Sequence, residues 1–186
     1  PEAAASAASA PQGGSAARGG PSLQEGAKKT PRVNLLGSGT ILRESIAAKK
    51  LLEADWGVAA NVWSCPSFNE LTRDGQDCER WNLLHPTDTP KVPFVAQQLE
   101  KYAGPVIAST DYMKTFAEQI RPFLPQGRDY RVLGTDGFGR SDTREKLRHF
   151  FEVDRHYVTV AALKALADEG AVPAAKVTAA MKKYGI

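Results

Sequence analysis

Cysteine and histidine are scarce in this sequence of 186 residues, which has two of the first and three of the second. Cys65 and Cys78 form neither a disulfide framework nor a Cys-x-x-Cys pair, and no cysteine–histidine cluster has the spacing of a zinc site. The sequence also contains no Gly-x-Ser-x-Gly elbow, Walker loop or His-Glu-x-x-His motif. These absences argue against a structural metal and against a hydrolase.

Long apolar runs and blocks of like charge are missing as well. No stretch approaches the ~20 consecutive apolar residues that a membrane-spanning helix needs, and the first residues lack the basic-then-apolar order of a signal peptide. The 24 Lys and Arg residues are interspersed with 21 Asp and Glu residues, which gives a net charge of +3 without a basic stripe. We therefore expect a soluble, cytoplasmic protein that binds neither membrane nor nucleic acid.

The first part of the chain differs in composition from the rest. Residues 1–22 are almost entirely Ala, Ser, Gly and Pro, with no aromatic residue and no apolar periodicity. Such a segment buries too little surface to offset its ordering entropy. We predict a disordered low-complexity tail or linker over residues 1–27 and one folded domain over residues 28–186. Composition leaves open whether the tail is a natural interdomain hinge or an artificial addition.

Apolar runs and helical patterns alternate through the remaining sequence. Strands are predicted at residues 32–36, 59–64, 106–108 and 130–133, and helices at 41–54, 67–70, 76–84, 94–102, 112–120, 143–151, 154–169 and after Pro173. The strands are apolar throughout instead of alternating with polar residues, which is typical of a parallel sheet covered on both faces. We predict a three-layer α/β/α domain with a mostly parallel sheet of four to five strands, closed by two C-terminal helices.

Several single residues also have predicted roles. Ser67 and Asp142 are each followed three residues later by glutamate, so both are expected to cap a helix, and Asp154 is expected to cap the long helix after it. His149 has apolar neighbours that suggest packing. Cys78 has no base nearby in the sequence and is predicted to be an inert, partly buried thiol.

Glycine turns follow two of the predicted strands, and Ser109-Thr110-Asp111 follows a third. Gly37 and Gly39 resemble the start of a dinucleotide-binding fingerprint, but Leu42 stands where its third glycine belongs, which favours a plain strand-to-helix turn. The carboxyl ends of parallel strands meet at one edge of a sheet, where open α/β sheets bind ligands. We expect a candidate site there, for an anion or for a neighbouring domain, formed by Gly37, Ser38, Gly39, Asp111, Asp136, Gly137, Gly139, Arg140 and Ser141.

Four motifs in order carry a resemblance to a known family. Residues 33–43, 73–82, 108–114 and 133–142 resemble the C-terminal domain of the bacterial homodimeric pyruvate dehydrogenase E1 component, and the likeness runs over residues 28–186. The resemblance implies the transketolase C-terminal fold, whose mostly parallel sheet has five strands. The fifth strand would precede Arg32, in the weakly strand-like segment 22–28.

The resemblance also implies a parent enzyme and its partners. That enzyme uses thiamine diphosphate and magnesium to decarboxylate pyruvate and passes the acetyl group to the lipoyl group of the dihydrolipoamide acetyltransferase component. The implied partners are the N-terminal and middle domains of the same E1 chain, a second E1 subunit and the acetyltransferase.

The family's catalytic and cofactor-binding residues belong to its other domains, so the resemblance assigns none to this chain. The Gly-Asp-Gly turn with a later Asn that holds magnesium is also missing, since the nearest string is Thr135-Asp136-Gly137 and no Asn follows Asn82. We expect a structural, dimerising module that is inactive alone.

Such a module would leave an apolar patch bare. Trp56, Trp63, Trp81 and Tyr112 are candidates for the patch, although a place in the core is favoured for each of them. The alternative is a stand-alone doubly wound module that binds a phosphate-bearing ligand over the turns at Gly37, Asp111 and Gly139.

Overall fold

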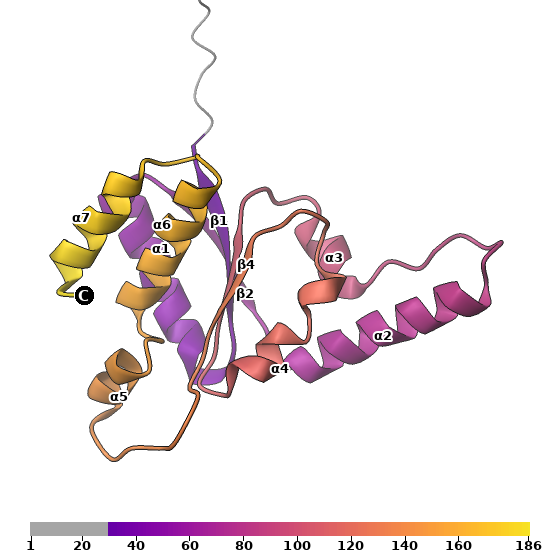
Figure 1. The fold of residues 1–186 in the computed structure, drawn as a ribbon, viewed down its shortest axis with the longest axis horizontal. Coiled ribbons are helices and arrows are strands. Elements are labelled where there is room, and N and C mark those ends of the chain that lie inside the picture. The colour runs from indigo at the N-terminus through magenta and orange to yellow at the C-terminus, as the bar shows by residue number, and fades with distance from the viewer. Residues whose placement is uncertain (1–29) are drawn as a thin grey trace, which may run out of the picture.

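A computed structural model describes residues 30–186 of the protein (Figure 1). The predictions of a tail over residues 1–27, of a domain start at residue 28 and of a fifth strand in residues 22–28 lie outside the described residues. The described sheet has four strands, β1 (Arg32–Gly37), β2 (Ala59–Ser64), β3 (Val106–Ser109) and β4 (Tyr130–Leu133). All four predicted strands are present, with bounds that differ by no more than one residue.

The sheet is parallel throughout and has the order β2-β1-β3-β4. β1 lies inside it, so that Leu35 is opposite Val62 of β2 and Ile107 of β3. The neighbouring Leu36 points to the other face, because successive side chains alternate along a strand. Leu35 and Leu36 belong to two different apolar clusters, one on each face of the sheet. This double burial explains why β1 has apolar side chains on both faces; its one buried polar residue, Asn34, is hydrogen-bonded to the Ala103 carbonyl and to Asn61.

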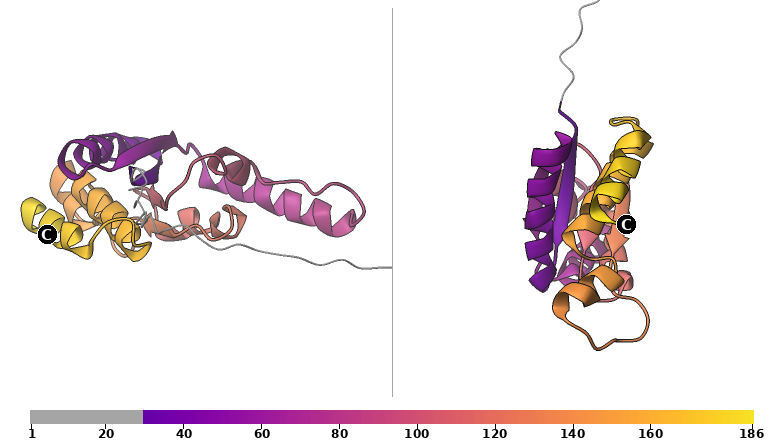
Figure 2. Two further views of the ribbon diagram at one scale, coloured as in Figure 1. Left: turned by 90° about the horizontal axis from the view of Figure 1, so that it is seen from above. Right: turned by 90° about the vertical axis from the view of Figure 1, so that its left-hand side faces the viewer.

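Helices cover both faces of the sheet, as predicted. They are α1 (Leu42–Trp56), α2 (Phe68–Leu84), α3 (Phe94–Leu99), α4 (Lys114–Glu118), α5 (Arg144–Phe150), α6 (Arg155–Asp168) and α7 (Ala174–Tyr184). α1, α6 and α7 lie on one face, and α2, α3 and α4 lie on the other (Figures 1 and 2). Within residues 30–186, no helix combines the length and apolar character needed to cross a membrane.

The first core lies between the sheet and the layer of α1, α6 and α7. Leu52 of α1 and Leu163 and Leu166 of α6 are fully buried there against Val33 and Leu35 of β1. The second core joins Leu36 and Val106 of the sheet to side chains of the opposite layer, Phe68, Leu99 and Ile120. These two cores confirm the three-layer prediction.

α2 corrects the prediction of two short helices at 67–70 and 76–84. Ser67 does cap it, since its hydroxyl accepts a hydrogen bond from the Glu70 amide at 3.2 Å. The helix then continues through Gly75, where a helix break was expected. A Cβ added at Gly75 would lie 2.4 Å from the Phe123 ring, in the turn of 3-10 helix Arg121–Phe123. Because Gly75 has no side chain, the Phe123 ring packs directly against the backbone of α2.

The C-terminal half of α2 forms an arm that extends away from the sheet (Figure 1). The loop after it returns along the helix and is held by Asn82, which donates to the Lys91 carbonyl at 2.9 Å and accepts from the Lys91 amide at 2.7 Å. Nearer the body, the Asp74 carboxylate accepts from the Phe94 amide at 2.6 Å. Leu83, at the end of the arm, is 78% exposed.

Two helices are shorter than predicted. The helix expected at 94–102 ends at Leu99, and that expected at 112–120 covers only Lys114–Glu118. The second begins late because the Thr110 hydroxyl accepts from the Tyr112 amide at 3.1 Å and Met113 is extended, which makes residues 110–113 a turn. After Glu118 the chain tightens into 3-10 geometry, with the Ile120 amide bonded to the Ala117 carbonyl.

Gly75→Ala is expected to lower the free energy of unfolding by about 1–2 kcal/mol, which is an overpacking cost of up to ~3 kcal/mol reduced by the helix propensity of alanine. The added methyl group must displace the buried Phe123 ring, and this overpacking outweighs the ~1 kcal/mol that alanine gains over glycine inside a helix. Urea unfolding followed by circular dichroism measures the change. Gln76→Ala, at the exposed neighbouring position, is the control and should stay within about 0.5 kcal/mol of wild type. A Gly75→Ala protein as stable as the control would contradict the packing argument.

Candidate functional site at the carboxyl edge of the sheet

The turns after β1, β3 and β4 meet at the carboxyl edge of the sheet. β1 leads into α1 on one face, whereas the helices that precede and follow β3 cover the other face. Backbone hydrogen bonds continue past the strands, from the Ser38 amide to the Ser109 carbonyl and from the Thr110 amide to the Leu133 carbonyl, both 3.1 Å. The chain leaves β1 toward one face of the sheet and β3 toward the other. In open α/β sheets, ligands bind in the crevice that forms between two such strands.

Two of the nine predicted site residues lie beneath the surface. Gly37 and Ser38 are buried, and a Cβ on Gly37 would come within 2.7 Å of the Leu42 Cα. Gly37 thus allows β1 and α1 to approach closely. Directly below, the hydroxyls of Ser45 and Ser109 are hydrogen-bonded at 2.9 Å. The structure gives these residues a role in joining strand and helix.

Asp111 connects the three turns at this edge. Its carboxylate accepts a hydrogen bond from the Thr40 hydroxyl at 3.2 Å, and its backbone carbonyl accepts one from the Thr135 hydroxyl at 2.6 Å. The carboxylate also lies 3.7 Å from the position that a Cβ on Gly39 would occupy. The predicted pair Gly39 and Asp111 is therefore brought together, with Asp111 exposed at the surface.

The other predicted residues lie on the loop between β4 and α5. Asp136 bonds the Lys114 amide at 3.0 Å and lies 3.7 Å from the Lys114 ammonium group. Beyond it, Gly137, Gly139 and Ser141 are exposed, and the Arg140 guanidinium stacks 4.1 Å above the Phe150 ring. Phe138, which sequence reasoning did not single out, is 96% exposed at the end of this loop.

A cleft of about 640 Å³ lies between these turns and α5. We call it the edge cleft and define it by Thr40, Asp111, Thr135, Arg140, Arg144 and Arg148. Arg144 and Arg148 are one helical turn apart on α5, so they lie on the same side of that helix, and Arg140 lies in the loop before it. Sequence reasoning found Arg140 but missed Arg144 and Arg148, although the spacing was visible.

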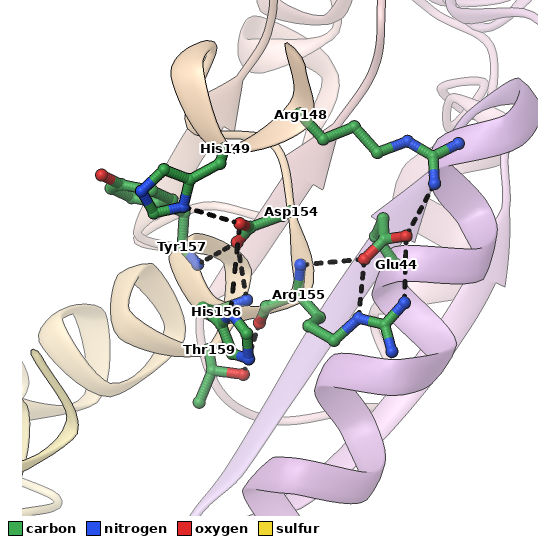
Figure 3. Close-up of polar contacts among 8 residues, drawn as sticks. All are labelled: Glu44, Arg148, His149, Asp154, Arg155, His156, Tyr157 and Thr159. Carbon is green, nitrogen blue, oxygen red and sulfur yellow. Dashed lines mark hydrogen bonds and ion pairs between the residues drawn. The ribbon is translucent and has the colours of Figure 1, made fainter. Parts of the chain in front are cut away.

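Glu44 holds α5 and α6 against α1 (Figure 3). Its side chain is only 4% exposed. It accepts hydrogen bonds from the Arg148 side chain at 2.8 Å, from the Arg155 guanidinium at 2.9 and 3.2 Å, and from the Arg155 amide at 3.1 Å. A buried carboxylate with this many donors is well compensated. Burial alone would raise the pKa of Glu44, but the bonds and charge of Arg155, with Arg148, hold that pKa below its ordinary value.

Asp154 caps α6, as predicted, by accepting from the amides of His156 and Tyr157 at 2.8 and 3.0 Å. Its second oxygen lies 3.1 Å from Nδ1 of His149 (Figure 3). The expectation that His149 packs among its apolar neighbours is not met, because the ring is exposed and lies at the Asp154 cap of α6. The predicted cap at Asp142 is also wrong, since Thr143 accepts from the Lys146 amide in that role while Asp142 binds the Thr143 amide.

The described residues offer no metal centre or reactive thiol. Between residues 30 and 186, no three His, Cys, Asp or Glu side chains are grouped so that they could hold a metal ion. Cys65 is buried, and burial raises the pKa of its thiol to about 12. Cys78 is also buried, and its pKa is raised by burial and by the nearby charge of Asp74. This agrees with the prediction of an inert thiol at Cys78.

The fold and its turns define a doubly wound α/β/α domain with a crevice at the topological switch point. Residues 19–154 match the family of transketolase-like TK C-terminal domains, and the chain belongs to that family. It is 69% identical over 156 residues to the pyruvate dehydrogenase E1 component of Cupriavidus necator, a match that covers 84% of this chain and 17% of that protein. The corresponding protein of Pseudomonas aeruginosa is 60% identical over 165 residues, covering 88% and 19%.

A solved structure described as a split gene transketolase, inactive beta4 tetramer, aligns with a TM-score of 0.48 and 18% identity over 75% of this chain and 41% of that chain. The chain thus spans less than a fifth of the length of the two curated relatives named above.

Glu44→Gln is expected to reduce the free energy of unfolding at pH 7 by about 1.5–3 kcal/mol, the usual contribution of hydrogen bonds to a charged group. The pKa of Glu44 is lower in the folded protein than its ordinary value of 4.5, so its charge stabilises the fold above that pH. This stabilisation is lost as pH falls through the folded-state pKa. The deficit of the variant should therefore shrink below about pH 4.5 in urea titrations.

Glu53→Gln, on the same helix, is the control for this experiment. Glu53 is 45% exposed and pairs with Lys49 at 3.6 Å, so its loss should change stability by less than about 1 kcal/mol. A Glu44→Gln deficit that is equal to the control, or that does not change with pH, would refute the role assigned to Glu44.

Proposed function

We propose that the chain serves as the C-terminal domain of a pyruvate dehydrogenase E1 component. In this proposal the whole enzyme oxidatively decarboxylates pyruvate with thiamine diphosphate and magnesium and transfers acetyl to the lipoyl group of the acetyltransferase component. The observation that carries the proposal is the 69% identity over 156 residues to a protein of that name, together with the family match. The limited coverage of that relative makes this chain a module within the enzyme.

Residues 30–186 do not fit the thiamine and magnesium group. Magnesium requires several oxygen ligands in near-octahedral geometry. Asp136, in the nearest resemblance to the magnesium-binding turn, is bonded to the Lys114 amide and paired with its ammonium group. We therefore assign no catalytic step and no cofactor contact to the described residues.

Exposed apolar side chains support a role in packing against other domains. One group is at the end of the α2 arm, where Leu83, Leu84 and Val92 are 78%, 56% and 51% exposed. The core place favoured for Tyr112 is wrong, since that ring is 54% exposed beside the exposed Met113. Trp56, Trp63 and Trp81 are half-buried. Exposed apolar groups of this kind mark surfaces that another protein surface covers.

The proposed partners follow from this role. The N-terminal and middle domains of the same E1 chain would cover the apolar groups, a second E1 subunit would complete the homodimer, and the dihydrolipoamide acetyltransferase would accept the acetyl group. In this proposal the module helps to position the domains that form the active site and provides none of the reacting groups. It is proposed to be inactive alone.

The purified chain, supplied with pyruvate, thiamine diphosphate, magnesium and an artificial electron acceptor, is expected to release no carbon dioxide above the buffer rate. The physical reason is that, among residues 30–186, no three His, Cys, Asp or Glu side chains are grouped so that they could hold the metal ion. Full-length E1 component of Cupriavidus necator is the positive control in the same assay. Carbon dioxide release that co-purifies with the chain through two chromatographic steps would refute the proposal.

A Leu83→Ser/Leu84→Ser double variant is expected to fold normally but to lose binding to the remaining domains. Both side chains are more than half exposed, so the urea midpoint should stay near wild type. Binding to a Cupriavidus necator E1 polypeptide that lacks the matching region should weaken at least about tenfold, because truncating a buried apolar anchor costs over ~1 kcal/mol. Met181→Ser, on the opposite layer and 38% exposed, is the control. Equal binding by both variants would exclude the arm as a contact.

A further inference from the structure

We propose that Asp136 is a modification site at which aspartate converts to isoaspartate by reaction with the backbone amide of Gly137. The proposal goes beyond the function above and does not depend on it, because the reaction needs only this chain and water. Aspartate followed by glycine favours the reaction, since glycine has no Cβ to obstruct its own amide and leaves the backbone free to rotate. The sequence contains this pair twice, at Asp74–Gly75 and at Asp136–Gly137.

The reaction balances without an oxidant, a reductant or a second substrate. The Gly137 nitrogen attacks Cγ of the protonated Asp136 carboxyl, so that a C–N bond forms, a C–O bond breaks, and the hydroxyl leaves as water with the amide proton. Water then opens the resulting cyclic imide. Cleavage of the bond from nitrogen to Cγ restores aspartate, whereas cleavage of the bond to the main-chain carbonyl carbon leaves the chain running through Cγ, as isoaspartate.

The attacking nitrogen is accessible. Gly137 lies in the exposed loop between β4 and α5, with a φ of +90°. Apart from its neighbours in the chain, no heavy atom lies within 4 Å of the position that a Cβ on Gly137 would occupy. Among residues 30–186, no backbone hydrogen bond involves the Gly137 amide. The amide is therefore free to turn toward the preceding side chain.

The Asp136 carboxyl group is held only by contacts at the surface. It accepts a hydrogen bond from the Lys114 amide at 3.0 Å and lies 3.7 Å from the Lys114 ammonium group. The side chains of Asp136 and Lys114 are 52% and 47% exposed. An exposed ion pair of this kind contributes little free energy. The carboxyl group can thus leave Lys114 and reach the Gly137 nitrogen by movement within the loop, while the core stays folded.

Asp74 and Gly75 form the same pair in surroundings that oppose the reaction. Gly75 is buried inside α2, where backbone amides donate to carbonyls of the preceding turn, and the Phe123 ring packs against it. The Asp74 carboxylate accepts from the Phe94 amide at 2.6 Å. Attack at Gly75 requires opening of a packed helix, a state far less populated than the movements of an exposed loop. This pair is therefore an internal control.

Conversion would also release the start of α4. Lys114 is the first residue of that helix, and Met113 before it makes no side-chain cap, so Asp136 supplies the acceptor for the Lys114 amide. Isoaspartate has one more carbon in the main chain and one fewer in the side chain, which moves the carboxylate away from that amide. We expect the Lys114 amide to exchange with solvent faster in the converted protein.

Incubation of the purified 186-residue chain at physiological temperature and pH tests the proposal. Digested samples are labelled by a protein L-isoaspartyl methyltransferase with radioactive S-adenosylmethionine, and a sample from the start sets the background. The peptide with residue 136 should gain at least about tenfold more label than the peptide with residue 74. Asp136→Glu should abolish this label, because the longer side chain must close a larger ring. Asp142→Glu makes the same change in the same loop and should leave it unaltered.

Asparagine variants give an independent rate. Asp136→Asn and Asp74→Asn follow the same route with loss of ammonia, and the rise in mass as nitrogen is replaced by oxygen is read by mass spectrometry. Asp136→Asn should react at least about tenfold faster, with circular dichroism verifying that both variants are folded. Equal rates in the two variants, equal label at residues 136 and 74, or label at residue 136 that does not rise above the background would overturn the proposal. Unchanged hydrogen exchange at Lys114 in the converted chain would overturn the release of α4.

Discussion

The Glu44 carboxylate is the interaction on which the carboxyl-edge architecture depends. α5 contributes no buried residue of its own, so apolar packing alone does not fix its position. Arg148 on α5 and Arg155 at the start of α6 both bind the 4%-exposed carboxylate of α1. Because the edge cleft lies between α5 and the strand turns, its shape follows from this ion cluster. The buried ion cluster thereby determines how far the exposed side chains of the edge cleft lie from one another.

The sheet was predictable because its signal is local. Strands such as β1 are buried on both faces, which favours a short run rich in apolar residues, and such runs are readable without knowledge of the partners. α2 was divided in error at Gly75 because glycine in a sequence indicates a break. The reason for that glycine is the Phe123 ring, 48 positions further along the chain. When two elements that are distant in sequence pack closely, the sequence shows only the glycine and does not show the residue that it contacts.

The candidate site was predictable in outline and not in detail. Strand ends mark the edge, and in the structure Asp111 and the loop with Arg140 line one cleft there, with Asp111 beside Gly39. The role of Glu44 was not visible, because its partners have no fixed spacing from it and it stands among charged residues that resemble a solvated helix face. The position of His149 was predicted wrongly for a related reason, since its apolar neighbours in the sequence do not indicate its contact with Asp154. Sequence patterns locate backbone features better than they locate polar partners.

The distance in sequence between Glu44 and its arginines affects how the protein folds while the ribosome makes it. The carboxylate precedes Arg148 by 104 residues and Arg155 by 111. At about 5–20 residues per second, roughly 5–22 s separate the emergence of α1 from that of its ionic partners. During this interval the carboxylate remains in water, with α1 and β1 lacking the α6 layer that buries them. The topology therefore leaves the apolar side of α1 and β1 uncovered until α6 has been synthesised.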